Sequence, residues 1–232
     1  MKPVFDEIRL LVEALRPHEV RVVGGAVRAW LRKDPLQGVD VDMAVAATPD
    51  EIEQKLHAAG IVTTDEGKRW GTITAHLNGE TYEMTALRTD EYMPGSRYPT
   101  VKFGVDWETD AARRDFTFNA VYVDEHEDVF DPFNGVDDLK NGIVRFIGDP
   151  EKRMAEDPLR LYRFWRFCAI YGVGGVTPEV VECSRNALAG LFSASRNRRG
   201  EEWRKITEAP QGATVLAELE RHGLFEGMRV SL

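Results

Sequence analysis

Hydrophobic residues recur at two different spacings over the first fifty residues of the chain. Between residues 5 and 15 they repeat at helical spacing, which predicts an amphipathic helix. The apolar run at residues 20–23 predicts a short strand that ends at Gly24-Gly25, and residues 26–32 then continue as a helix. Strict alternation of apolar and polar residues at 39–45 predicts another strand.

Residues 48–51 predict the start of a further helix. Thr48 is suited to the N-cap position, Pro49 to the first turn, and Glu51 stands three residues after the cap, as in a capping box. This helix should run to about Ala59 and stop at Gly60.

The next segment is rich in strand-forming residues. Two runs, 71–77 and 81–87, flank Asn78-Gly79, and this dipeptide predicts a tight hairpin turn. A further strand is expected at 119–123. Residues 89–107 contain several prolines and glycines with little periodicity, which predicts a loop.

The pattern changes near residue 146. Helices are predicted at 154–171 and 178–191, and the helical pattern continues to the C-terminus. We therefore expect an α+β chain with an α/β domain at residues 1–145 followed by an all-helical domain at residues 146–232.

Composition narrows the class of protein. The chain has 232 residues, 43% hydrophobic and 30% charged, which is ordinary for a globular protein. It has no long apolar run, no signal-like N-terminus and only two cysteines, so we expect a cytoplasmic protein without a membrane partner. The net charge of −9 argues against non-specific polyanion binding, but residues 145–210 carry a net charge of +3.

Carboxylates on the predicted strands suggest a metal site. Asp40 and Asp42 stand two apart, so both should project from one face of the strand at 39–45. Crowded carboxylates repel unless a cation lies between them, and Mg²⁺ prefers oxygen ligands. Glu83 could complete a trio. A solvated polar face of the sheet is the alternative explanation.

Two other segments could hold phosphates. Gly24-Gly25 follows a strand and opens a helix, where backbone N–H groups favour an anion, and Arg28 would add charge-assisted hydrogen bonds. A simple tight turn explains the glycines equally well. Arg113 and Arg114 could hold phosphates bidentately, with Asp115 fixing one of them; a structural ion pair is the alternative.

The segment 156–167, predicted to be helical, carries a charged stripe in which Asp157, Arg160, Arg163 and Arg166 recur every three residues. A solvated helix face is one explanation. Alternatively, a carboxylate accepts from the exocyclic amine of cytosine or adenine while an arginine donates to the adjacent ring acceptor. Such a pair could select C and A without a template.

Taken together, these segments resemble the class II tRNA nucleotidyltransferases, or CCA-adding enzymes, and the related bacterial poly(A) polymerases. The resemblance rests on an ordered set of motifs between about residues 20 and 170. The matching segments are Gly24-Gly25-Ala26-Val27-Arg28, Asp40-Val41-Asp42, Tyr82-Glu83 with Leu87-Arg88, 113–120, Asp131-Pro132-Phe133-Asn134-Gly135, and Glu156-Asp157-Pro158-Leu159-Arg160.

The resemblance implies a polymerase-β-like nucleotidyltransferase head at 1–145 and a helical neck at 146–232. It implies that Asp40 and Asp42 hold the catalytic Mg²⁺, with Glu83 as the third catalytic carboxylate. The nucleotide-binding residues that it implies are Gly24, Gly25, Arg28, Arg114, Asp157, Arg160, Arg163 and Arg166. The loop at 89–107 matches a flexible loop that the family needs to switch from C to A addition.

The implied activity is template-independent addition of C and A to tRNA 3′ ends from CTP and ATP, with release of pyrophosphate. A poly(A) polymerase, or a degenerate RNA- or nucleotide-binding module without catalysis, are the alternatives. Oligomeric state is left open. The chain departs from the family at Ala29, where an aspartate is usual, and at 195–202, where the match is loose. It ends at Leu232, where the family continues into body and tail domains.

Overall fold

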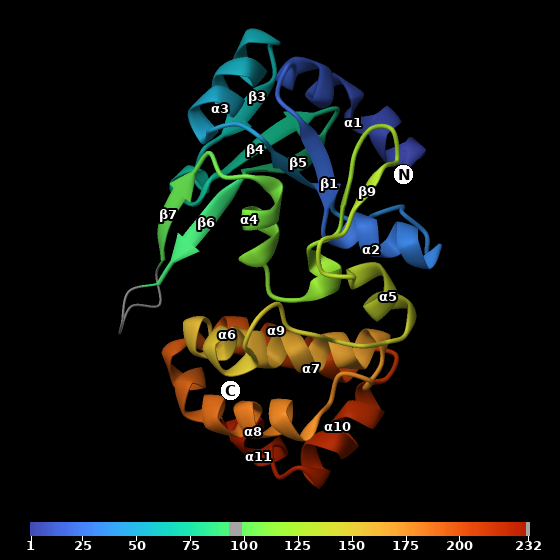
Figure 1. Ribbon diagram of the computed structural model, residues 1–232, viewed down its shortest axis with the longest axis vertical. Helices are drawn as coiled ribbons and strands as arrows, with labels where there is room; N and C mark the ends of the chain where they lie inside the picture. The colour runs from blue at the N-terminus through green and yellow to red at the C-terminus, as the bar shows by residue number, and fades with distance from the viewer. Residues whose placement is uncertain (93–98, 231–232) are drawn as a thin grey trace. The chain divides into compact units, whose positions relative to one another are not determined.

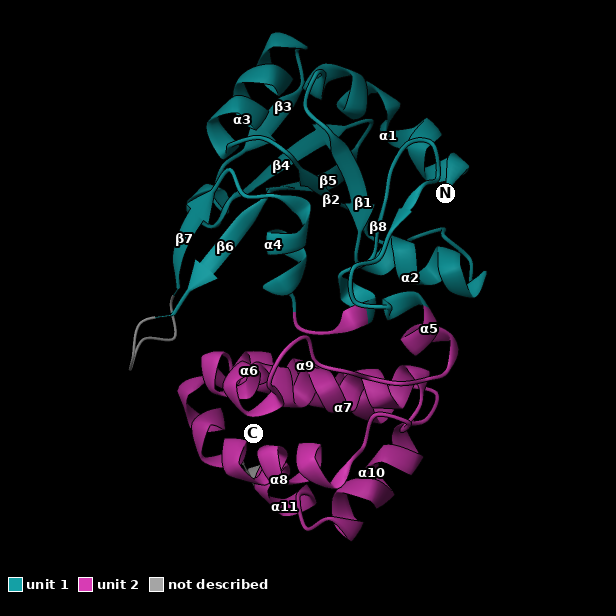
Figure 2. Cartoon of the chain, in the orientation of Figure 1, with its two compact units in different colours: residues 1–114, 118–136 teal, residues 115–117, 137–232 magenta. Residues whose placement is uncertain are grey.

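The computed structural model describes residues 1–92 and 99–230, which form two compact units (Figure 2). Unit 1 comprises residues 1–114 and 118–136, and unit 2 comprises residues 115–117 and 137–232. Unit 1 contains a β-sheet with helices, and unit 2 is helical. The predicted α+β class is confirmed. The assignment of residues 1–145 to a catalytic head and 146–232 to a neck stays a prediction.

A seven-stranded sheet forms the centre of unit 1, in the order β3-β4-β5-β2-β1-β8-β9. Figure 1 labels β1, β3, β4, β5 and β9 of this sheet. β2 runs parallel to β5 and antiparallel to β1. A separate hairpin pairs β6 with β7. The strands are β1 Val20–Val23, β2 Asp42–Val45, β3 Val62–Thr64, β4 Thr72–Leu77, β5 Glu80–Ala86, β6 Arg88–Glu91, β7 Thr100–Phe103, β8 Tyr122–Val123 and β9 Val129–Phe130.

One face of this sheet holds the core of unit 1. Alternate strand residues such as Val22, Met43 and Met84 are fully buried there together with apolar residues of the helices. Hydrophobic burial on this face is the main stabilising contribution. The helices that begin in unit 1 are α1 Lys2–Leu15, α2 Gly25–Arg32, α3 Pro49–Ala58, α4 Trp107–Ala112 and α5 Gly135–Lys140.

Local signals in the sequence explain several boundaries. Thr48 caps α3: its hydroxyl accepts from the Glu51 N–H at 3.3 Å, and Glu51 Oε2 accepts from the Thr48 N–H at 2.7 Å. This is the predicted capping box. Asn78 and Gly79 both have positive φ, 54° and 85°, as a two-residue hairpin turn between β4 and β5 requires. Both predictions are confirmed.

Unit 2 packs around a buried helix, α7, which runs from Leu159 to Tyr171. An aromatic cluster lies at its N-terminal half, where Phe146 and Phe164 stack with ring centroids 5.6 Å apart and Phe116 lies 4.7 Å from Phe146. A β-bridge joins Phe116 to Phe146. The other helices of this unit are α6 Pro150–Glu156, α8 Pro178–Ala187, α9 Arg196–Glu208, α10 Gly212–Arg221 and α11 Phe225–Val230.

Within unit 1 the structure differs from the predicted elements at 89–107, at 119–123 and at the start of the strand predicted over 39–45. The segment 89–107, predicted to be a loop, contains β6 residues, all of β7 and the start of α4, because cross-strand partners stabilise strands too polar to predict. Residues 93–98 of that predicted loop lie outside the described residues. The strand predicted at 119–123 is limited to Tyr122–Val123, after a 3₁₀ turn.

In the described ranges 1–92 and 99–230, none of the helices has the length and apolar character needed to cross a membrane.

Candidate active site

The face of the sheet opposite the core carries polar side chains from adjacent strands. Asp42 begins β2 and is paired with Glu83 of β5, while Thr85 of β5 is paired with Thr72 of β4. Since alternate residues of a strand face opposite sides, the buried Met43 and Met84 turn inward and Asp42 and Glu83 turn outward. The period of two therefore places carboxylates and hydroxyls on one surface.

The loop between β1 and α2 lies against Asp42. Gly24 is the N-cap of α2 and has a φ of +78°, a conformation that favours glycine. A Cβ at Gly24 would lie 3.0 Å from Asp42 Oδ2. The two predicted segments, the glycine turn and the carboxylate strand, are thus brought together at the N-terminus of α2.

Asp40 does not share a strand with Asp42. The prediction of a strand over 39–45 is wrong at its start, because β1 ends at Val23, opposite Asp42, and the chain turns away at Gly24. Asp40 therefore has no strand partner and is exposed. Its charge still acts on Asp42.

The Asp42 carboxyl titrates abnormally. Burial raises its pKa to about 6, and the negative charges of Glu83 and Asp40 add to the shift. The guanidiniums of Arg114 and Arg28 oppose it. Asp42 is therefore close enough to four other predicted site residues, Glu83, Asp40, Arg114 and Arg28, for their charges to change its ionisation. Groups with such perturbed pKa values are concentrated at functional sites.

This donor set suits a hard divalent cation. Two carboxylates paired across adjacent strands repel each other, and this repulsion adds to the effect of burial in raising the Asp42 pKa. A cation would relieve the repulsion. Within the described part of the chain, no group of three or more His, Cys, Asp or Glu side chains is arranged to hold a metal. Mg²⁺ commonly binds through one or two carboxylates, water and substrate phosphates, so a two-carboxylate site fits it.

The two predicted phosphate-binding arginines are linked through one residue. Arg28 Nη1 donates to the side-chain oxygen of Asn119 at 2.6 Å, and Arg114 Nη1 donates to the Asn119 carbonyl at 3.4 Å. Asn119 was not among the predicted site residues. Its place in the matching segment 113–120, five residues after Arg114, was the signal available.

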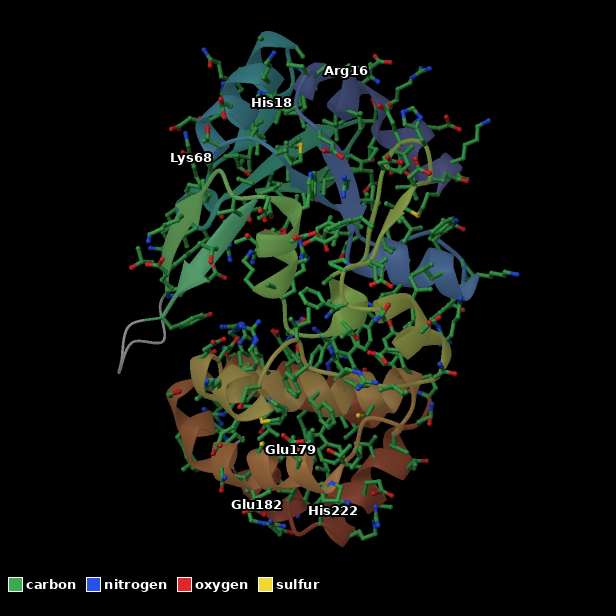
Figure 3. All side chains as sticks on the ribbon, in the orientation of Figure 1. Arg16, His18, Lys68, Glu179, Glu182 and His222 are labelled. Carbon is green, nitrogen blue, oxygen red and sulfur yellow. The ribbon has the colours of Figure 1, made fainter. Side chains whose placement is uncertain are left out.

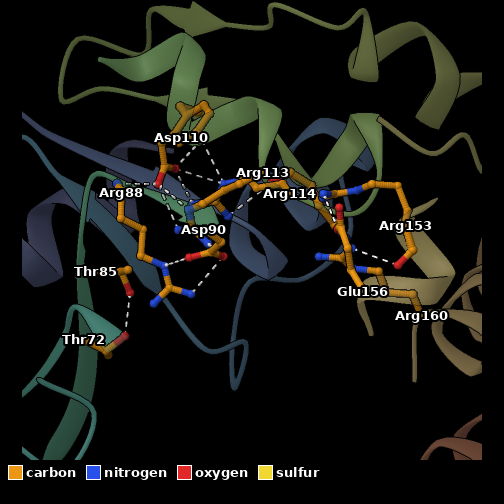
Figure 4. Close-up of polar contacts among 12 residues, drawn as sticks. Thr72, Thr85, Arg88, Asp90, Asp110, Arg113, Arg114, Arg153, Glu156 and Arg160 are labelled. Atoms are coloured by element: carbon orange, nitrogen blue, oxygen red, sulfur yellow. Dashed lines mark hydrogen bonds and ion pairs between the residues drawn. The ribbon is translucent and has the colours of Figure 1, made fainter. Parts of the chain in front are cut away.

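A buried carboxylate, Asp110, organises the arginines (Figure 4). Arg113 Nε donates to its Oδ1 at 2.9 Å, and Arg114 Nη2 donates to its Oδ2 at 3.2 Å. Burial opposes ionisation of Asp110, but the charges of Arg114 and Arg113 outweigh it, so its pKa lies below the usual value. Sequence reasoning missed Asp110, although its spacings of three and four from the arginines signal such pairs.

Asp42, Glu83, Arg113 and Arg114 line a pocket of about 240 Å³ in unit 1. The Thr72 and Thr85 hydroxyls lie 3.0 Å apart at its wall. Arg88 also lines it, paired with Asp90 at 3.1 Å. The pocket combines carboxylates, hydroxyls and guanidiniums, the groups that bind a cation and a phosphate. Its lining residues are Val23, Asp42, Met43, Thr72, Glu83, Thr85, Arg88, Arg113 and Arg114.

In unit 2, the predicted helix over 154–171 is wrong as a single element. Pro158 lacks an N–H and disfavours the helical conformation in the residue before it. Asp157 accordingly has φ −142° and ψ 103° between α6 and α7. Its Oδ1 accepts from the Leu159 N–H at 3.0 Å, so Asp157 stands at the start of α7.

The predicted base-reading arginine, Arg160, is buried and held within unit 2 (Figure 4). Its Nη1 donates to Glu156 Oε2 at 2.5 Å and to the Arg153 carbonyl at 3.0 Å. Asp157 stands on the same turn, since the Arg160 N–H donates to the Asp157 carbonyl at 2.9 Å. Glu156, the residue before Asp157, thus orients the guanidinium of Arg160.

The other two arginines of the stripe are also ion-paired. Arg163 Nε donates to Asp115 Oδ2 at 2.7 Å, and Arg166 Nη1 donates to Glu202 at 3.1 Å. Asp115 therefore pairs with Arg163, whereas Asp110 is the carboxylate that pairs with both arginines at 113 and 114. The stripe is therefore not a solvated helix face, because Arg160 is buried and Arg163 and Arg166 are ion-paired. Its role in nucleotide binding stays a prediction.

Two of the histidines have contacts within their own units. His18 Nδ1 lies 3.3 Å from the Ala46 carbonyl, and His222 Nε2 lies 3.4 Å from Glu218 (Figure 3). Both are accounted for by local contacts.

Comparison with known proteins gives one consistent result. Residues 20–145 match the family model "Poly A polymerase head domain". The chain is 41% identical over 198 residues to human mitochondrial CCA tRNA nucleotidyltransferase 1, covering 82% of this chain and 44% of that protein. It is 34% identical over 227 residues to the CCA-adding enzyme of Geobacillus stearothermophilus, covering 97% of this chain and 54% of that enzyme.

Solved structures agree. The crystal structure of a Bacillus stearothermophilus CCA-adding enzyme in complex with CTP superposes with a TM-score of 0.81 at 30% identity, covering all of this chain and 58% of that one. The chain spans about half the length of the curated relatives it matches. Its family is nevertheless established by the match over residues 20–145. The chain belongs to the poly A polymerase head-domain family, as a relative of the class II CCA-adding enzymes.

Proposed function

We propose that this chain carries the nucleotidyl-transfer centre of an enzyme that adds C and A to tRNA 3′ ends. The 3′ hydroxyl oxygen of the RNA forms a bond to the α-phosphorus of CTP or ATP. The bond from that phosphorus to the oxygen bridging the α- and β-phosphates breaks, pyrophosphate leaves, and the hydroxyl proton is released to solvent. No template is read. The relatives named CCA-adding enzymes support this reaction.

Asp42 carries the proposal. It lies beside the N-cap glycine of α2, with Glu83 on the neighbouring strand and the charges of Asp40, Arg28 and Arg114 acting on it. Phosphoryl transfer depends on such positioning and electrostatic stabilisation. A structural ion cluster would not need a phosphate-accepting helix start next to crowded carboxylates.

Each residue has a role in this proposal. Nucleotidyltransferases of this family generally use a divalent metal, and we infer that Asp40 and Asp42 hold Mg²⁺, with Glu83 as the third carboxylate. When bound, the ion would lower the pKa of the attacking hydroxyl and stabilise charge on the phosphates. The backbone N–H groups at Gly24 and Gly25 would bind phosphate oxygens.

The arginines of unit 1 would bind the nucleotide. Arg28 and Arg114 are both fixed through Asn119, which leaves their positive charge directed at the region of Asp42. Guanidiniums match phosphate geometry and remain charged at any working pH. They would neutralise the triphosphate.

Base selection is proposed for unit 2. The Asp157 carboxylate would accept from the exocyclic amine of cytosine or adenine, and Arg160 would donate to the adjacent ring nitrogen. Glu156 fixes Arg160 at 2.5 Å and so limits the directions in which the guanidinium can donate. Arg163 and Arg166 would help to hold the nucleotide.

The test is an extension assay on tRNA lacking its 3′ end, with products sized by mass. The purified chain is supplied with CTP alone, ATP alone, or both, in Mg²⁺. We expect CTP alone to add two residues and the pair to add three. Extension by A only would indicate a poly(A) polymerase, and nucleotide binding without extension would indicate a non-catalytic module.

A cytoplasmic location, expected from composition, stays a prediction.

A further inference from the structure

The hydroxyl of Tyr122 lies between the two groups that orient Arg114. It donates to Asp110 Oδ2 at 2.7 Å and accepts from Arg114 Nε at 2.8 Å. A phenol has one proton, and here it is used toward the carboxylate, so a lone pair faces the guanidinium. Tyr122 is in β8 and is fully buried, on the strand next to the glycine turn.

Asp110 is itself held in a fixed orientation. Its Oδ1 accepts from Arg113 Nε at 2.9 Å and from the Arg88 backbone N–H at 3.2 Å. Its Oδ2 accepts from Tyr122 and from Arg114 Nη2. Both oxygens are therefore committed, and the carboxylate cannot rotate without losing several charge-assisted hydrogen bonds.

The result is a guanidinium restrained on three sides. Arg114 Nε is held by the Tyr122 hydroxyl, Nη2 by Asp110 and Nη1 by the Asn119 carbonyl. The Tyr122 ring lies face-on to Arg114, with the guanidinium carbon 4.9 Å from the ring centroid. Arg114 and Asp42 line the same pocket. A rigid first contact of this kind is what accurate substrate positioning needs.

We propose that Tyr122, acting with Asp110, is a positioning residue that sets the direction in which Arg114 meets the nucleotide. The Tyr122 hydroxyl is the part of this arrangement that carries no charge of its own. Its removal leaves the Arg114–Asp110 ion pair in place. It takes away one hydrogen bond to Asp110 and the contact that holds Arg114 Nε, so the guanidinium plane is less tightly fixed. The inference rests on the proposed function, since Arg114 is there a nucleotide ligand.

Packing alone would explain the ring but not the hydroxyl. The ring contacts Trp107 edge-on at 5.5 Å between centroids and Phe130 at 5.9 Å. Phenylalanine would keep both contacts. Tyr122→Phe therefore separates the role of the hydroxyl from that of the ring.

The chain offers a matched control on the opposite face of the sheet. Tyr82 is also a buried strand tyrosine that donates to a carboxylate, Glu7 Oε1, at 2.5 Å. Tyr82→Phe removes the same atom and the same kind of bond. It lies in the apolar core cluster, away from the pocket.

The experiment measures Kd for CTP by titration calorimetry, which does not depend on turnover, and then KM for CTP, ATP and the RNA primer. For Tyr122→Phe we expect Kd for CTP and KM for CTP and ATP to rise about three- to tenfold, because Arg114 loses one of the hydrogen bonds that orient it. KM for the primer should be unchanged. Tyr82→Phe should leave every value within about twofold.

A double-mutant cycle with Arg114→Lys tests the route of the effect. If Tyr122 acts through Arg114, Tyr122→Phe should change Kd for CTP little in the Arg114→Lys background. An unchanged Kd in Tyr122→Phe, an equal change in Tyr82→Phe, or the same change in both backgrounds would overturn the inference. Absence of extension by the wild-type chain would instead overturn the proposed function, because CTP binding is measured separately.

Discussion

The two faces of the unit 1 sheet are made by alternate residues of the same strands, yet they have opposite chemistry. On β5, Met84 is fully buried in the core, and Glu83 beside it is exposed next to Asp42. On β1, Val22 is buried and Arg21 on the other face lies over the Trp107 ring at 4.2 Å. The apolar face stabilises the fold by excluding water. The resulting rigid sheet holds the like charges of the polar face close together.

The stability gained on the apolar face allows the fold to hold carboxylates that repel each other. Ionised Asp42 and Glu83 repel each other and destabilise the fold without a cation. The apolar face offsets this by burying residues such as Ile73, Met84 and Val45. A slip of one residue in strand register would exchange the two faces.

The largest expected effect follows from damage to the apolar face. Met84→Ala should lower the free energy of unfolding by about 2–5 kcal/mol, because it removes a fully buried side chain and leaves a cavity. Denaturant unfolding measures the change. The nucleotide affinity of the protein that remains folded should be unchanged within a few-fold. A loss of affinity with unchanged stability would show that the apolar face does not serve stability alone.

A smaller effect is expected at Gly24, where the glycine turn meets Asp42. Gly24→Ala should cost about 1–3 kcal/mol of stability, because alanine is strained at a φ of +78°. Its Cβ would also meet Asp42 Oδ2 at 3.0 Å, so extension activity should fall as well. Thermal unfolding and the extension assay check both outcomes.

Gly60→Ala is the control for that substitution. Gly60 has a φ of +75°, and a Cβ there would meet nothing within 4 Å. It should lose stability but keep activity. Equal losses of activity in the two variants would mean that strain, and not the contact with Asp42, matters at Gly24.

The smallest effect concerns pH. The Asp42 pKa is about 6 in the fold against 3.8 normally, so ionising Asp42 destabilises the folded state. This cost is absent below about pH 4, grows as pH rises toward 6, and is complete above it. Asp42→Asn should therefore raise the free energy of unfolding at pH 7.5 by about 1–2 kcal/mol, allowing for partial exposure, in metal-free buffer.

Unfolding of wild type and Asp42→Asn at pH 4 and pH 7.5 measures this difference. The gain should vanish at pH 4. A gain of the same size at both pH values would rule out ionisation of Asp42 as its cause.

Short local patterns in the sequence predicted several elements of the fold. The apolar run at 20–23 predicted β1 to the residue, and the capping box at Thr48 and the turn at Asn78-Gly79 were found from short patterns. Each depends on neighbouring residues alone. β6 and β7 were missed because their polar residues are strand-forming only when paired with each other.

The site was harder to predict where it depends on contacts between distant segments. Asp42, Glu83 and the glycine turn were found because each lies on an element with a clear pattern. Asp110 and Tyr122 were missed, since a buried carboxylate on a six-residue helix has no periodic signal and its partner lies twelve residues away. The break at Pro158 was available from the sequence but was overridden by the charged stripe.

Incorporation of labelled CTP and ATP by Asp42→Asn tests the central claim, that the polar face of the unit 1 sheet performs nucleotidyl transfer. Wild type and variant are compared on tRNA lacking its 3′ end, at equal concentrations of protein shown to be folded by its thermal transition. We expect Asp42→Asn to lower the rate of incorporation at least about a hundredfold with no loss of stability. Incorporation by Asp42→Asn within a few-fold of wild type would contradict it.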